Sequence, residues 1–147
     1  MLNDYLFRDR WAVRATTARV FGALVDLASY PAWWPDIRSV RQIDDDTAEV
    51  ICRSTLPYSL TFYLHRAAEN PATGVMRVDM TGDLEGYVQG VVAPHRTVGA
   101  LLDISQRVVV TKPLLRALSP VARPLFRANH ALMMRRGQRG FRAYLTG

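Results

Sequence analysis

The chain has 147 residues, of which 49% are hydrophobic and 22% are charged, and its net charge is +6. These values are typical of a globular protein and, with the length, predict one domain over residues 1–147. They exclude a disordered or fibrous chain, and no apolar stretch reaches the ~18 residues of a membrane-spanning helix.

The first 35 residues predict a strand followed by two helical elements. Residues 5–14 alternate well enough for a strand. Thr16 or Thr17 can cap a helix that carries apolar residues between 20 and 27 on one side. Pro31 ends or restarts this helix, so Pro-Ala-Trp-Trp-Pro at 31–35 predicts a tight aromatic second element.

The middle of the chain predicts an antiparallel sheet. Short alternating segments are separated by turn-forming residues such as the three aspartates at 44–46 and the Asn-Pro-Ala-Thr-Gly segment at 70–74. Their hairpin spacing favours one antiparallel sheet. The predicted strands are 37–43, 48–54, 58–67, 75–81, 87–93 and 101–110.

The rest of the chain predicts helix. Pro113 suits a first helical turn, and Ser119-Pro120 indicates a second helix start. Pro124 lies too deep for that start, which predicts a kink or a restart at this residue. From about 121 to 145 the pattern predicts one long helix. A sheet of six or seven twisted strands tends to curl, and one helix cannot fill its concave side. We therefore expect an apolar cavity between them, where small ligands commonly bind.

Several short segments, in this order, make the sequence similar to a known group. They are 11–13, 20–24, 30–35, 56–58, 81–86, 111–113, 129–130 and 133–137. Together they resemble the START-related SRPBCC superfamily of polyketide cyclase/dehydrase and lipid-transport proteins. The resemblance covers nearly the whole chain and implies an α+β helix-grip fold. In this fold a curved antiparallel sheet of six to seven strands wraps around a long C-terminal helix, with two short helices after the first strand. The resemblance also implies a hydrophobic pocket between sheet and helix, but no single function.

Two polar residues fall on the predicted apolar side of the long helix. At ~100° per residue, Leu125, Leu132 and Met133 form an arc that also contains Asn129 and Arg136. A buried amide needs partners, and a buried guanidinium needs an acid or a ligand anion. Asn129 therefore either orients a ligand carbonyl or hydroxyl or bonds the sheet. Arg136 either meets a ligand carboxylate or enolate or extends out at the pocket mouth.

The opposite side of the same helix is predicted to be basic. Residues 104–147 hold eight Arg and Lys112 but no acid, which indicates either a solvated helix or a surface for an anionic partner. An anionic membrane is the candidate partner. Nucleic acid is not expected, because this side lacks interleaved aromatics. The residues placed on it are Arg123, Arg127, His130, Arg135 and Arg142.

Aromatic residues supply further candidates for the pocket. Tyr58, Leu60, Phe62 and Leu64 share the strand face that suits the core, so the Tyr58 hydroxyl can reach the cavity. Trp33 and Trp34 (neighbours in one segment) either close the end of the core or place one ring at the pocket entrance, where it stacks on a flat ligand.

The motifs of several other classes are missing from the sequence. There is no phosphate loop, dinucleotide fingerprint or nucleophile elbow, and the three histidines have no metal-site spacing. The single cysteine, Cys52, excludes an internal disulfide and is expected to be a small core residue. We expect no metal and no cofactor. The N-terminus does not resemble a signal peptide, and with a single cysteine this favours the cytoplasm. A monomer or a homodimer is expected.

Three functions are compatible with these features. The first is binding of a hydrophobic or aromatic small molecule of polyketide, fatty acyl or isoprenoid type. The second is a polyketide aromatase/cyclase or dehydratase that shapes its substrate and stabilises an enolate through Arg136, Asn129 and Tyr58, without metal or nucleotide. The third is lipid transfer at a membrane surface through the basic helix. The candidate ligand-binding residues are Trp33, Trp34, Arg53, Phe62, Leu125, Leu132 and Met133.

Overall fold

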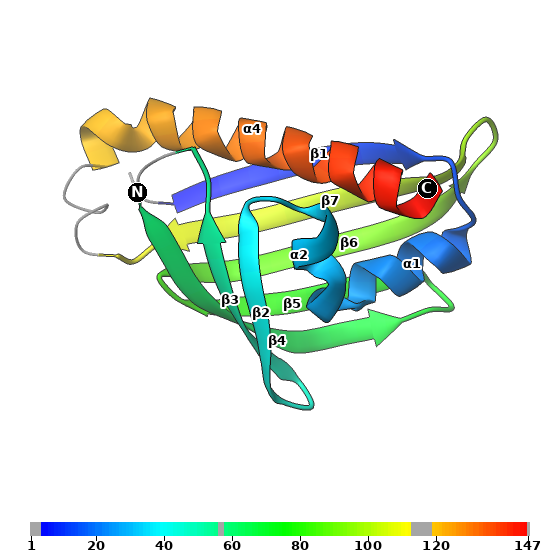
Figure 1. Cartoon of the computed structure of the whole chain (residues 1–147), viewed down its shortest axis with the longest axis horizontal. Coiled ribbons are helices and arrows are strands. Elements are labelled where there is room, and N and C mark those ends of the chain that lie inside the picture. Colours follow the sequence, from blue (N-terminus) through cyan, green and yellow to red (C-terminus); the bar gives the residue numbers. More distant parts are fainter. Residues whose placement is uncertain (1–3, 56–57, 113–118, 147) are drawn as a thin grey trace.

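A computed structural model of the chain describes residues 4–55, 58–112 and 119–146. In this part of the chain the strands form one antiparallel sheet with the order β1-β7-β6-β5-β4-β3-β2. The sheet is curved, and one long helix lies across it (Figure 1). The strands are β1 (Asp4–Val13), β2 (Ile37–Asp44), β3 (Thr47–Arg53), β4 (Ser59–Asn70), β5 (Val75–Gly82), β6 (Leu84–His95) and β7 (Gly99–Val110).

Three short helical elements connect β1 to β2: α1 (Thr17–Val25), η1 (Leu27–Ser29) and α2 (Tyr30–Trp33). The Thr16 side chain accepts a hydrogen bond from the Arg19 backbone N–H at 3.2 Å, which satisfies one free donor of the first turn of α1. The apolar side of α1 faces the sheet, where the Leu24 side chain fills the space that a Cβ atom on Gly90 of β6 would occupy. These helices close one end of the sheet's concave side (Figure 1).

The connection between β5 and β6 depends on glycine. Gly82 and Gly86 have positive φ values of 107° and 127°, a region that disfavours residues with a Cβ atom. A Cβ atom on Gly86 would lie 2.0 Å from the carbonyl oxygen of Arg107 in the neighbouring strand. The two glycines therefore allow a sharp return of the chain that keeps β5, β6 and β7 in register.

The long helix α4 (Ser119–Thr146) packs closely on α2 through two other glycines. A Cβ atom on Gly137 would lie 2.5 Å from the Trp34 ring, and one on Gly140 would lie 1.7 Å from the Trp33 carbonyl oxygen. Phe141 is fully buried beside them. The absence of side chains at the two glycines thus brings the backbones of α4 and α2 together.

The predicted fold class is confirmed: the structure is an α+β helix-grip arrangement with seven strands, short helices after β1 and a long C-terminal helix. Of the two alternatives at Pro124, a restart is ruled out, because α4 runs through this residue. A kink there stays a prediction. The predicted helical turn at Pro113 lies outside the described residues.

Within the described ranges, no helix combines the length and the hydropathy that a membrane crossing requires.

Candidate ligand-binding cavity

A cavity of about 150 Å³ lies between the concave face of the sheet and α4. Every strand contributes side chains to its lining, and α1, α2 and α4 cover the other side. An engineered apolar cavity of about this size accommodates a benzene ring, whereas pockets for drug-sized ligands run to ~300–1,000 Å³. The space therefore matches one ring or a short apolar segment of a larger molecule.

The lining is largely apolar because inward positions alternate along the strands. Tyr58, Leu60, Phe62 and Leu64 all line the cavity, as the strand period predicts. His65 lies on the other face of β4, where it contacts the side chains of Thr47 and Thr81.

Gln106 and His130 form a buried polar pair in the cavity wall. Gln106 is an inward residue of β7, and His130 faces it from α4 with 3.5 Å between Nε2 of the imidazole and Oε1 of the amide. The Gln106 amide also donates to the Met134 sulfur, a weak acceptor, at 3.4 Å. Because both contacts are weak or long, the pair keeps hydrogen-bonding capacity for a polar group of a ligand.

Burial determines the protonation of His130. Its imidazole stacks on the Phe7 ring with centroids 3.6 Å apart, and only 7% of the residue is exposed. Desolvation disfavours the imidazolium and lowers the pKa of His130 to about 4. At neutral pH the ring is therefore uncharged and can accept or donate a hydrogen bond, according to its tautomer.

Asn129 and Tyr58 line the cavity near its half-buried edge. The Asn129 side-chain oxygen accepts a hydrogen bond from the Thr55 backbone N–H at 3.1 Å, which connects α4 to the end of β3. Within the described residues no group accepts from its amide nitrogen. Asn129 thus binds the backbone after β3 through its side-chain oxygen. Desolvation raises the pKa of the Tyr58 phenol, so Tyr58 acts here as a neutral hydroxyl.

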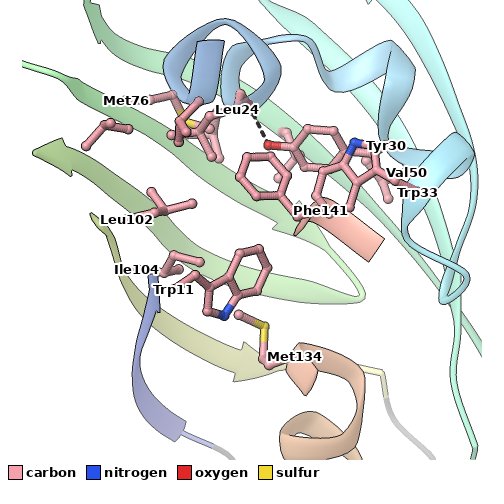
Figure 2. Close-up of a cluster of buried hydrophobic side chains, with 14 of the residues drawn as sticks. Trp11, Leu24, Tyr30, Trp33, Val50, Met76, Leu102, Ile104, Met134 and Phe141 are labelled. Atoms are coloured by element: carbon pink, nitrogen blue, oxygen red, sulfur yellow. Dashed lines mark hydrogen bonds between the residues drawn. The ribbon is translucent and has the colours of Figure 1, made fainter. Parts of the chain in front are cut away.

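Both tryptophans of α2 and its C-cap line the cavity, but their indole N–H groups differ. The Trp34 nitrogen donates to the Met133 carbonyl of α4 at 3.0 Å. The Trp33 nitrogen is buried, and no group in the described part of the chain accepts from it. Trp33 lies among Tyr30, Trp34 and Phe141, and Figure 2 shows the Tyr30, Trp33 and Phe141 rings together.

Cys52 is a buried lining residue opposite Met133, with 3.9 Å between the two sulfurs. Desolvation, with a contribution from Asp36, raises the pKa of its thiol to about 11. The thiolate is the nucleophilic form of cysteine, so this thiol has the character of a core residue.

The structure gives Arg136 a protein partner. Its guanidinium binds Asp36 in a bidentate pair, with Nε and one terminal nitrogen at 2.9 Å and 2.6 Å from the two carboxylate oxygens. Asp36 is 2% exposed. Burial alone would raise the pKa of this carboxyl, but the hydrogen bonds of Arg136 and Ser54 and the charge of Arg136 together outweigh it, and the pKa is lowered. Arg136 therefore ties α4 to the segment before β2 and does not line the cavity.

Three residues predicted to bind the ligand lie elsewhere. Arg53 is on the exposed face of β3, because the inward alternation there runs through Val50 and Cys52. Leu125 and Leu132 are 59% and 41% exposed on the outer side of α4. By contrast, Trp33, Trp34, Phe62 and Met133 lie in the lining.

The error for α4 is a rotation of its inward face. His130, predicted on the outer side, is buried, and the inward row continues through Met134, Gly137, Phe141 and Leu145 and leaves out Leu125 and Leu132. At ~100° per residue this row is turned by roughly 140°, more than a third of a circle, from the leucine arc. Hydrophobicity alone does not identify this inward face of α4, because glycine, methionine and histidine make part of its contacts.

Gln106 and His130 are the lining residues that sequence reasoning missed. A signal for Gln106 exists, because it occupies an inward position between Ile104 and Val108 in an alternating strand. A polar side chain in such a row is informative. His130 has no comparable local signal.

A second hollow, of about 190 Å³, lies beside η1 and the β2–β3 turn. It shares the Leu27, Val40, Met76 and Val78 side chains with the main cavity, but its rim carries acidic residues such as Asp44 and Asp46. No set of three His, Cys, Asp or Glu side chains in the described ranges could hold a metal ion.

No family model matches the chain, and no curated protein matches it in sequence. Solved structures do match it in shape. The Zhui aromatase/cyclase from a Streptomyces species is 12% identical with a TM-score of 0.81, and the match covers 97% of this chain and 94% of that chain.

Two further structures give the same result. The di-domain aromatase/cyclase StfQ of the steffimycin biosynthetic pathway is 13% identical with a TM-score of 0.75, covering 99% of this chain and 51% of that chain. A START superfamily protein from Mycobacterium smegmatis is 16% identical with a TM-score of 0.71, covering 97% of both chains. At these identities the likeness establishes the fold: the chain has the START-like helix-grip fold.

Proposed function

We propose that this protein binds an apolar or aromatic small molecule, of polyketide, fatty acyl or isoprenoid type, in the cavity under α4. The observation that carries the proposal is an apolar cavity with a weakly satisfied polar pair, Gln106 and His130, in its wall. Small-molecule sites are typically apolar spaces with a few polar groups that orient the ligand. The fold supports the proposal without fixing the ligand, because one fold serves many functions.

Native mass spectrometry of the purified protein, followed by denaturing extraction, tests this proposal. A thermal-shift panel of fatty acids, aromatic polyketides and isoprenoids extends the test to weaker ligands. We expect a bound apolar molecule or a rise in melting temperature with one of these classes. No bound mass and no shift with any class would contradict the proposal.

A matched pair of variants assigns such binding to the cavity. Val88→Phe adds a ring at a half-buried lining position, whereas Leu132→Phe enlarges an exposed residue on the outer side of α4. We expect Val88→Phe to remove binding and Leu132→Phe to retain it. Equal effects of the two substitutions would place the ligand outside the cavity.

The second candidate function is catalysis of the aromatase/cyclase or dehydratase type. A specific observation favours it: His130 is uncharged at neutral pH and lies in the cavity wall with Gln106 as a neighbour. A neutral imidazole can accept a proton from a carbon next to a carbonyl, and Gln106 can donate to the oxygen of the resulting enolate. Tyr58 and Asn129 are additional polar groups at the edge of the same space.

Because Arg136 already binds Asp36, His130 is the residue at which to test catalysis. With a poly-β-ketone thioester as substrate, we expect His130→Gln to lose cyclisation while it retains ligand-induced thermal stabilisation. Unchanged cyclisation in this variant, or no cyclisation by the wild-type protein, would leave ligand binding as the function.

The exposed side of α4 supports the third candidate function, lipid transfer at an anionic membrane surface. Leu125 and Leu132 are exposed near the polar edge of the cavity, and Arg135, Arg139 and Arg142 follow along the same side. Each basic residue near an anionic bilayer contributes about 1 kcal/mol of attraction. Cosedimentation with phosphatidylserine vesicles, but not with phosphatidylcholine vesicles, is the expected result.

A further inference from the structure

One buried hydrogen-bond donor of the cavity has no protein partner. Within residues 4–55, 58–112 and 119–146, the Trp33 indole nitrogen is the single buried side-chain nitrogen or oxygen that lacks a hydrogen bond. Trp33 is 6% exposed and contributes to the cavity lining. Folded proteins rarely leave such a donor unmatched, because its lost hydration is not compensated.

The neighbours of Trp33 in the cavity wall are mainly aromatic rings. Its ring packs against Tyr30 and Phe141, with centroid distances of 4.8 Å and 4.9 Å, and stacks on Trp34 at 5.4 Å. Aromatic faces accept hydrogen bonds weakly. The Tyr30 hydroxyl donates to the Leu24 carbonyl at 2.5 Å (Figure 2), and its oxygen does not accept from the Trp33 nitrogen.

Trp34 shows that the fold can satisfy an indole at this place. Its nitrogen donates to the Met133 carbonyl, whereas the neighbouring Trp33 nitrogen has no equivalent acceptor in α4. Trp33 is also held in position, since its backbone carbonyl lies directly against Gly140 of α4. A fixed donor loses little conformational freedom when an acceptor arrives, so it is well suited to recognise a ligand.

We propose that the Trp33 indole N–H selects ligands that carry an oxygen acceptor, a carbonyl above all, at the α2 end of the cavity. This inference rests on the proposed function and adds a chemical requirement to it. Gln106 and His130 lie toward the other end: Trp33 packs on Phe141, which is eleven residues or about 16 Å along α4 from His130. The two polar positions therefore recognise different parts of a molecule.

Two probes of the same shape test the requirement. Acetophenone and α-methylstyrene differ only in a carbonyl oxygen replaced by a methylene group, and each has a single ring that matches the cavity. In the ¹H–¹⁵N spectrum of the wild-type protein, the three tryptophans give three indole signals. We expect the Trp33 signal to move downfield with acetophenone relative to α-methylstyrene, while the Trp34 signal does not distinguish the probes.

Matched variants measure the same preference as affinity. Trp33→Phe keeps a ring but removes the donor, and we expect it to weaken acetophenone binding about five- to tenfold with less than a twofold change for α-methylstyrene. Trp34→Phe is the control, because its donor is already occupied by Met133. The spectra of the wild-type protein decide the question if Trp33→Phe does not fold.

The outcomes separate this inference from the proposed function. If both probes bind but affect the Trp33 signal equally, or if Trp33→Phe weakens both alike, the donor requirement is overturned and ligand binding stands. If neither probe binds the wild-type protein, while a larger ligand does, the inference fails for this cavity end. If no ligand of any class binds, both the proposed function and the inference fail.

Discussion

The two halves of α4 face the same sheet but do different things. The half around Gly137, Gly140 and Phe141 packs tightly on α2 and borders the cavity only at its α2 end. The half around Asn129 and His130 carries polar side chains and covers open space. Small residues and one large ring thus anchor the helix at one end, and this holds the other end above the cavity.

The largest effect is expected from breaking the anchored half. Phe141 is fully buried against Trp11 and Trp33, so Phe141→Ala leaves a void and should lower the free energy of unfolding by about 3–5 kcal/mol. Urea unfolding monitored by tryptophan fluorescence measures this loss. Leu132→Ala on the exposed side of the same helix is the control, with a change of about 0.5 kcal/mol or less. Similar losses in the two variants would show that the anchored half is not special.

A smaller effect is expected at the junction between the two halves, where Arg136 binds Asp36. Arg136→Met keeps the aliphatic part of the side chain but leaves the Asp36 carboxylate buried without its partner. Because Arg136 itself is partly exposed, we expect a loss of about 2–3 kcal/mol, below the usual cost for a fully buried pair.

The double variant Arg136→Met/Asp36→Asn provides the control for this junction. A neutral amide is less costly to bury than a carboxylate, so part of the lost stability should return. The lowered pKa of Asp36 gives the sign of the pH effect: the pair stabilises the fold above ~pH 4, and this contribution disappears as pH falls through the folded pKa. No recovery in the double variant would contradict an ionic role for Asp36.

The smallest effect concerns the open half and is a pH dependence. The pKa of His130 is lowered to about 4 by burial, so the unfolded chain takes up a proton between ~pH 6.5 and pH 4 that the folded protein does not. We expect the free energy of unfolding to fall by about 2 kcal/mol from pH 7 to pH 5 through this residue. His130→Gln should flatten the pH dependence, which urea titrations at the two pH values measure.

His65 is the matched histidine for this experiment, because it lies on the outer face of β4 away from the cavity. His65→Gln measures what the replacement of a histidine outside the cavity wall does to the slope between pH 7 and pH 5. An equal flattening by both substitutions would mean that burial in the cavity wall is not the cause.

Part of the candidate site could be predicted from the sequence. Tyr58 and Phe62 were placed correctly, since a strand alternates its side chains with a period of two and the better apolar row must face the core. The aromatic pair Trp33 and Trp34 was also found, because two tryptophans between prolines form a distinctive segment. Neither argument needed information from distant parts of the chain.

The rest of the site could not be predicted because it depends on distant partners. The helical pattern allows Arg136 either to meet a ligand anion or to extend out at the pocket mouth, but its carboxylate comes from Asp36, which is a hundred residues away. The indole donors of Trp33 and Trp34 look equivalent in the sequence, and only the position of Met133 above them makes them different.

Local patterns in the sequence predict the order of the elements, the antiparallel sheet and the covering helix. Strand alternation, turn residues and the helical period are each recognised within a few residues. The inward side of α4, and with it the polar groups that line the cavity, follows from contacts between distant segments. This orientation depends on the close approach of Gly137 and Gly140 to α2, a contact between distant segments that leaves almost no hydrophobic signal in the sequence.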